Sequence, residues 1–92
     1  MFEWDEGKRA LTLEKHALDF QDAWRRFDGR PVISIPARTE TETRFLTVGK
    51  LREDKFYTVI WTQRGEARRI ISFRRSRHGE ERQHIAVHGG GA

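Results

Sequence analysis

The sequence contains no cysteine, which excludes a disulfide framework and a zinc site built from thiolates. It also lacks an apolar leader and any run near the roughly 20 apolar residues that a membrane-spanning helix requires. Its 92 residues include no glycine-rich phosphate-binding loop and no internal repeat. These absences favour an intracellular, cytoplasmic protein that does not bind a membrane.

Acidic residues are scarce in one part of the chain. Residues 64–82 carry seven arginines and three acids, whereas residues 1–63 carry 11 bases and 11 acids, so the whole net charge of +4 arises in the later stretch. The seven arginines are Arg64, Arg68, Arg69, Arg74, Arg75, Arg77 and Arg82. Because guanidinium binds phosphate or carboxylate through paired hydrogen bonds, they indicate an anionic partner: RNA, DNA or an acidic protein. The alternative is a solvated strand and helix with ion pairs inside the protein.

Three Trp and six Phe are enough aromatic residues to build one small core. The pattern of apolar residues predicts helices at about 6–16, 20–27 and 76–87, and strands at 2–5, 32–36, 43–49, 56–63 and 67–74. Turns are expected at 52–55 and 64–66. This order predicts an α+β domain over residues 1–88, followed by a disordered tail at 89–92. We expect two N-terminal helices packed on one face of an antiparallel sheet, and a C-terminal helix.

Acidic residues stand where the first two helices should begin. Asp5 precedes the first helix and is expected to cap it. Asp19 precedes the second, and Asp22 follows three residues later, which resembles a capping box with Asp in place of Glu. The second helix then has an apolar stripe made of Phe20, Ala23, Trp24 and Phe27. Ser76 is a possible cap for the last helix.

Three segments of the chain carry the motifs of one known family. The first, FEWDEGKRALTLEKHALDF, has the family's residues at Phe2, Trp4, Asp5, Lys8, Lys15, His16 and Phe20. The second is Arg44 with Gly49 five residues later, and the third is RGEARRIISFRRS, which begins at Arg64. In this order and spacing the segments resemble the BrnT family of bacterial toxins from type II toxin–antitoxin systems, and the resemblance covers residues 2–82.

The resemblance implies a RelE-like fold and a ribonuclease that needs no cofactor and stops growth by cleaving RNA. It also implies a BrnA-like antitoxin with a ribbon-helix-helix DNA-binding domain, which neutralises the toxin. The complex would bind operator DNA only through that antitoxin.

Cleavage of RNA through its 2′-hydroxyl needs a base, cations that stabilise the phosphorane, and an acid for the leaving oxygen. The chain is rich in cations and poor in acid–base pairs, so His16 is the main candidate for proton transfer. We favour Arg74 over Arg75 for the phosphate, because the two should point to opposite faces and Ile70 and Ser72 should share the face of Arg74. The predicted catalytic residues are His16, Lys15, Arg44, Arg64 and Arg74. The predicted RNA-binding residues are Lys8, Arg75, Arg77 and His78.

Each of these residues also has a structural interpretation. A histidine at a helix C-terminus commonly caps the helix, and an arginine that begins a strand can simply protect a sheet edge. Lysines on the first helix and the arginine of the 64–66 turn can be solvated. His78 and Glu80 could complete an acid–base set or could be exposed helix residues. His84 and His88 have the spacing of metal ligands, but without a third ligand nearby we expect no metal site.

Two other functions compete with a metal-independent endoribonuclease. One is a non-catalytic nucleic-acid-binding or operon-corepressor module that acts with a ribbon-helix-helix partner. The other is a protein-interaction module whose arginines bind an acidic segment of an antitoxin, which is compatible with catalysis because the antitoxin would cover the phosphate site.

Overall fold

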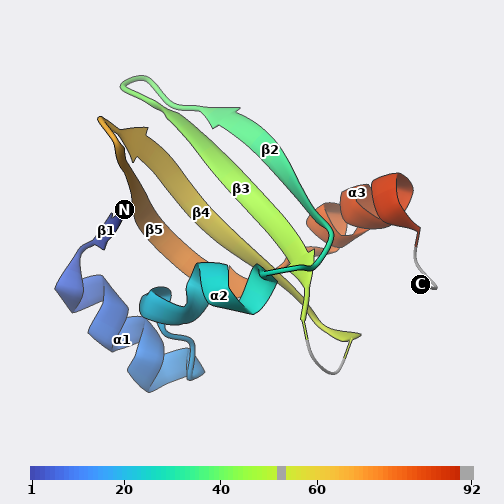
Figure 1. Cartoon of the computed structure of the whole chain (residues 1–92), viewed down its shortest axis with the longest axis horizontal. Coiled ribbons are helices and arrows are strands. Elements are labelled where there is room, and N and C mark those ends of the chain that lie inside the picture. The colour runs from blue at the N-terminus through green and yellow to red at the C-terminus, as the bar shows by residue number, and fades with distance from the viewer. Residues whose placement is uncertain (52–53, 90–92) are drawn as a thin grey trace.

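The computed structural model describes residues 1–51 and 54–89, which form a five-stranded sheet flanked by helices (Figure 1). The elements are β1 (Phe2–Trp4), α1 (Glu6–His16), η1 (Phe20–Asp22), α2 (Ala23–Phe27), β2 (Val32–Arg38), β3 (Thr43–Lys50), β4 (Phe56–Arg64), β5 (Ala67–Arg75) and α3 (His78–His88). The α+β fold predicted from the sequence is therefore confirmed. The predicted turn at 52–55 and tail at 89–92 fall partly on residues 52–53 and 90–92, which lie outside the described residues. No helix among the described residues is long and apolar enough to cross a membrane.

The strands lie in the order β1-β5-β4-β3-β2. Strands β2 to β5 form an antiparallel meander, but β1 pairs with β5 in parallel. The predicted all-antiparallel sheet is wrong at this edge. The reason is topological: the chain leaves β1 through the helices and returns through four strands, and the last of these runs in the same direction as β1.

The first helix is capped as predicted but packs differently. The Asp5 carboxylate accepts a hydrogen bond from the Lys8 N–H at 3.0 Å, and the left-handed Ala17 (φ 55°) ends the helix. No residue of α1 is buried, because Leu11 and Leu13 are two positions apart and cannot form one apolar stripe. Instead of sharing a sheet face with α2, α1 lies beside the β1–β5 edge (Figure 1), so the predicted placement of two helices on one face holds for η1 and α2 alone.

The predicted capping box of the second helix does not form as such. Asp19 caps the short η1 helix by accepting a hydrogen bond from the Gln21 N–H at 3.0 Å. Asp22 makes no capping bond and instead lies 3.6 Å from the Arg25 guanidinium. The Asp19 carboxylate is also held by Arg9 of α1, with Nε–Oδ1 at 2.7 Å and Nη2–Oδ2 at 3.0 Å. This ion pair attaches α1 to the start of η1.

The core lies between η1–α2 and one face of the sheet. Its buried members include Leu18, Phe20, Ala23, Phe27, Leu51, Val59, Trp61, Ile70 and Phe73. Gly49 of β3 allows a close approach here, because an added Cβ would lie 2.7 Å from two ring carbons of Phe27. The Arg68 guanidinium lies over both Trp24 and Trp61, 4.9 and 4.6 Å from their ring centroids, and closes the core at the β1 end.

A β-bulge in β5 changes which side chains share a face. Ile60 pairs with Ser72, whereas Trp61 pairs with Ile70, so Ile71 is the extra residue. As a result Ile70 and Phe73 both point into the core. The expectation that Ile70 shares the face of Arg74 is therefore wrong, because period-2 alternation breaks at the bulge.

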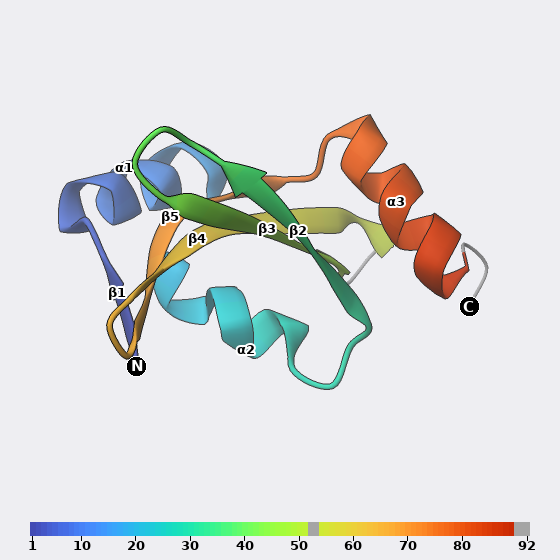
Figure 2. The ribbon, with the colours of Figure 1, turned by 90° about the horizontal axis from the view of Figure 1, so that it is seen from above.

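The last helix, α3, covers one end of the opposite face of the sheet (Figure 2). It begins at His78, two residues after the predicted start. Ser76 does not cap it; its hydroxyl bonds Thr58 Oγ1 at 2.7 Å. Glu80 and His84 are its buried residues. His84 Nε2 lies 3.0 Å from the Pro31 carbonyl oxygen, and His88 Nε2 lies 2.9 Å from that of Val32, where β2 begins. These contacts fix the helix to the sheet.

Candidate functional site

An open hollow of about 530 Å³ lies beside β5, where the C-terminal end of α1 approaches the strand. Its lining residues are His16, Leu18, Tyr57, Arg74 and Arg75. We call it the β5 hollow. It brings together three of the predicted site residues from segments far apart in the sequence, and none of its lining residues is acidic.

Arg75 is the freer of the two arginines in the β5 hollow. Its side chain is exposed, and its guanidinium lies 5.5 Å from the ring centroid of Tyr57, the cross-strand neighbour of Arg75. Within the described part of the chain it forms no ion pair. Its cationic group is thus held in place by an aromatic face and remains available to an anion.

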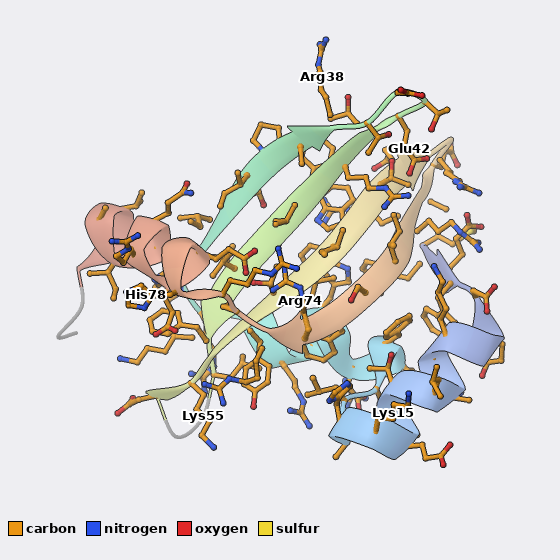
Figure 3. All side chains as sticks on the ribbon, turned by 180° about the vertical axis from the view of Figure 1, so that it is seen from behind. Lys15, Arg38, Glu42, Lys55, Arg74 and His78 are labelled. Carbon is orange, nitrogen blue, oxygen red and sulfur yellow. The ribbon has the colours of Figure 1, made fainter. Side chains whose placement is uncertain are left out.

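Arg74 points to the other side of β5, as the alternation of the strand predicts, and is already paired. Its Nη1 and Nη2 donate to Glu80 Oε1 and Oε2 at 2.9 and 2.8 Å. Nη1 also donates to the Arg75 carbonyl at 3.0 Å. Figure 3 shows Arg74 on the sheet face that α3 partly covers. The sequence favoured Arg74 for phosphate, but a carboxylate of the protein occupies the position that a phosphate would take.

Glu80 is the centre of a hydrogen-bond network. Besides Arg74, Thr58 Oγ1 and the Arg77 N–H donate to its Oε1, each at 2.9 Å. Burial alone would raise the pKa of Glu80, but the hydrogen bonds from Arg74, Arg77 and Thr58 outweigh burial and lower this pKa to about 2. A carboxyl group with this pKa stays ionised at neutral pH. Both oxygens of Glu80 are engaged by donors of the protein, which favours a structural role for this anion; an acid–base role beside His78 stays a prediction.

His16 is the histidine that lines the β5 hollow. It is the last residue of α1 and is exposed, and the helix ends immediately after it because Ala17 adopts a left-handed conformation. The helix dipole favours a cation at this end. Lys15 precedes it in the same turn and is also exposed; Figure 3 shows Lys15 on α1, at the edge of the sheet beside β5.

Arg44 and Arg64 lie elsewhere. Arg44 Nε and Arg64 Nη2 contact opposite oxygens of Glu42, at 2.9 and 3.7 Å. Arg64 comes six residues after Thr58, the cross-strand neighbour of Arg74, which at ~3.3 Å per residue is roughly 20 Å along β4. The five residues predicted as one catalytic set therefore form two groups at opposite ends of the sheet.

The remaining predicted RNA-binding residues surround these groups without entering the β5 hollow. Lys8 is exposed in the first turn of α1, about two turns from His16. Arg77 and His78 are exposed at the start of α3, where Arg77 is the residue before the helix. Figure 3 places His78 on the same sheet face as Arg74.

Sequence reasoning missed one residue of the site and the contact of another. Tyr57 was assigned only to an apolar strand, although its pairing with Arg75 makes it part of the wall of the β5 hollow. Glu80 was considered as an acid–base group or an exposed helix residue, and its pairing with Arg74 was not predicted. The spacing of Arg74 and Glu80 across the start of α3 is a signal that could have suggested an ion pair, but not a buried one.

The structure contains no cluster of three or more metal-ligating side chains among the described residues. His84 and His88, which have the spacing of metal ligands, each use Nε2 to contact a backbone carbonyl. The centroids of their rings are 4.8 Å apart, and the two histidines hold α3 against β2.

Comparison with known proteins gives an independent result. The family model described as "Ribonuclease toxin, BrnT, of type II toxin-antitoxin system" matches residues 4–80. Among solved structures, the chain is similar to the ribonuclease toxin BrnT of Brucella abortus, with 31% sequence identity and a TM-score of 0.59. The match covers 85% of this chain and 99% of that chain. No curated protein matches the chain significantly.

Proposed function

The chain belongs to the BrnT family of type II ribonuclease toxins, and from this we propose that it is a metal-independent endoribonuclease whose site is the β5 hollow. Its substrate is RNA and its partner an antitoxin. Family membership does not favour a purely non-catalytic binding module. We place the site here because His16, Arg74 and Arg75 all line one open hollow.

In the proposed reaction the RNA 2′-oxygen attacks the adjacent phosphorus and loses its proton to a base, while the bond from phosphorus to the 5′-oxygen breaks. The leaving oxygen takes up a proton, which yields a 2′,3′-cyclic phosphate and a free 5′-hydroxyl. His16 supplies the imidazole in the hollow and is proposed to transfer the proton. Arg75 supplies positive charge to the phosphorane oxygens, since no described carboxylate pairs with it.

Arg74 plays a second role in this proposal. The two hydrogen bonds to Glu80 fix the Arg74 side chain. Arg74 Nη1 also donates to the Arg75 carbonyl, which fixes the backbone of Arg75. Arg74 is thus proposed as a positioning residue for Arg75, while its own charge is paired with Glu80. Lys15 is proposed to contact the phosphate from α1, and Lys8, Arg77 and His78 to contact flanking RNA.

Arg44 and Arg64 are proposed to act away from the bond that is cleaved. Their shared partner Glu42 stands near the start of β3, so the pair stabilises the connection between β2 and β3. We further propose that the toxin arrests growth in the cytoplasm and is neutralised by a BrnA-like ribbon-helix-helix antitoxin, which would carry the complex to operator DNA.

Cleavage of total RNA in EDTA by the purified chain tests the proposal. The parent is expected to cleave, and His16→Ala and Arg75→Ala are each expected to lose about 10²- to 10³-fold in rate. Arg82→Ala is the matched control, because Arg82 is an exposed arginine of α3 outside the hollow. RNA with 2′-deoxy residues should resist cleavage.

Two outcomes would contradict the proposal. A folded parent that does not cleave in EDTA but cleaves with Mg²⁺ would remove the metal-independent mechanism. Equal rates for the parent and both hollow variants would remove the assignment of the site, even if the chain is a ribonuclease.

A further inference from the structure

A second hollow adjoins the β5 hollow on the side of α2. It has a volume of about 670 Å³, within the roughly 300–1,000 Å³ typical of ligand sites. Its lining residues are Asp22, Arg25, Arg26, Asp28, Arg30, Leu51 and Tyr57. We call it the α2 hollow. Tyr57 lines both hollows, so its side chain forms the ridge between them.

The α2 hollow carries positive charge that no intramolecular contact fully neutralises. Arg26 is exposed and forms no ion pair with any described residue. Arg25 lies 3.6 Å from Asp22, but its side chain is 83% exposed, so water screens this contact strongly. Arg30 donates from Nη1 to the Lys50 carbonyl at 3.2 Å, which holds it in place without removing its charge.

We propose that the α2 hollow is a second nucleotide subsite, which binds the single-stranded RNA flanking the phosphate held in the β5 hollow. Arg26 and Arg30 contact the backbone phosphate there. Tyr57 and Arg75 together form the ridge over which the RNA chain passes. This inference rests on the proposed ribonuclease function. It adds the path that the bound RNA strand follows from the β5 hollow, across Tyr57, into the α2 hollow.

The composition of the ridge favours RNA over other anions. Single-stranded nucleic acids are bound by basic grooves that include aromatic rings and arginine planes, on which bases stack. The Arg75 guanidinium lies over the Tyr57 ring, and the edge-on contact of Tyr57 with Phe73, 6.0 Å between centroids, keeps that ring attached to the core. The two hollows together are lined by five arginines and two aspartates, Asp22 and Asp28, so they form a track of net positive charge with the Tyr57 ring between them.

The length of the track leads to a test that does not require cleavage. Binding of fluorescently labelled 2′-deoxy oligonucleotides is measured for a dinucleotide and for an oligomer of about eight nucleotides. The parent should bind the oligomer more tightly. Arg26→Ala should weaken oligomer binding about 5- to 10-fold and reduce the salt dependence by roughly 0.7, the slope that one phosphate contact contributes on a single strand.

Arg38→Ala is the matched control, because Arg38 is an exposed arginine at the distant end of β2 (Figure 3). If Arg38→Ala weakens oligomer binding as much as Arg26→Ala does, net charge alone explains the effect and the subsite is rejected. If Arg26→Ala leaves oligomer binding unchanged, the α2 hollow does not bind RNA. If Arg26→Ala weakens only the complex with the antitoxin, the hollow binds protein and the inference is wrong.

These outcomes are separable from failure of the proposed function. Loss of the ribonuclease hypothesis would appear as a parent that does not cleave RNA at all. Loss of the subsite would appear as a parent that cleaves, with an oligomer affinity insensitive to Arg26. Tyr57→Leu provides a second probe: loss of stacking is expected to weaken oligomer binding about 5- to 100-fold, provided that its unfolding midpoint shows a folded protein.

Discussion

Replacement of Glu80 by glutamine tests the energetic role of the network below Arg74. The substitution keeps the size of the side chain but removes its charge and places an amide NH₂ against the Arg74 guanidinium or the other donors. A fall in pKa from 4.5 to about 2 corresponds to about 3 kcal/mol, at 1.36 kcal/mol per unit. Because the Arg74 side chain keeps 23% exposure and is partly hydrated, we expect Glu80→Gln to lower the free energy of unfolding by about 2–3 kcal/mol at pH 7.

The stability difference between the parent and Glu80→Gln should depend on pH in a known direction. The folded state lowers the pKa of Glu80, so the carboxylate contributes its full stability above the unfolded pKa near 4.5 and loses it as the pH falls towards about 2. Urea unfolding of the parent and of Glu80→Gln is therefore compared at pH 7 and at several values between these limits. The two proteins should differ most at pH 7 and converge at the acidic end.

Glu81→Gln is the control, because Glu81 is the neighbouring acid and forms no ion pair with a described residue. It should stay within ~0.5 kcal/mol of the parent. A melting temperature is a convenient second measure, since a loss of about 2–3 kcal/mol should lower it by roughly 8–20 °C in a domain of this size. The reasoning is refuted if Glu80→Gln is as stable as the parent at pH 7, or if its deficit is the same at every pH.

Other substitutions test separate parts of the structure. Gly49→Ala should lower the free energy of unfolding by about 1–3 kcal/mol in urea titrations, because its Cβ would meet the Phe27 ring. Gly79→Ala, at a helical position with open space around it, should raise the same quantity by about 0.5–1 kcal/mol; a loss would contradict the described helix start. Asp19→Asn should destabilise the protein by about 1 kcal/mol near neutral pH, and this difference should shrink in acid, since hydrogen bonds from Arg9 and then from the Gln21 N–H lower the pKa of Asp19. Arg74→Ala should reduce both RNA cleavage and thermal stability, whereas an effect on cleavage alone would contradict its role in fixing Glu80.

The strands were predictable from the sequence because their signal is local. The predicted strands 43–49, 56–63 and 67–74 differ from β3, β4 and β5 by one residue at the C-terminal end. Alternating apolar residues and the tight turn at Gly65 (φ 58°) specify this meander within a short window. Asp5 and Asp19 also cap helices as expected, since a side chain two or three residues from its partner needs no tertiary context.

The orientation of the site residues was not predictable in the same way. The bulge at Ile71 depends on how β5 meets β4, and nothing in "RRIISFRRSR" marks the extra residue. The pairing of Arg74 with Glu80 depends on the position of α3 over Thr58. The separation of Arg44 and Arg64 from His16 is likewise a property of the sheet, because strand order and direction decide which ends of the strands meet.

The parallel pairing of β1 with β5 has a consequence for when the toxin becomes active during synthesis. Phe2–Trp4 cannot pair in the sheet until Arg68–Ile70 have been synthesised. The β5 hollow likewise needs both His16, at the end of α1, and the later residues Arg74 and Arg75. A ribosome therefore has to translate the chain through Arg75 before either the sheet edge or the β5 hollow can form. If the β5 hollow is the catalytic site, as we propose, a partly made chain carries the histidine without its arginines and is not expected to cleave RNA until this domain is nearly complete.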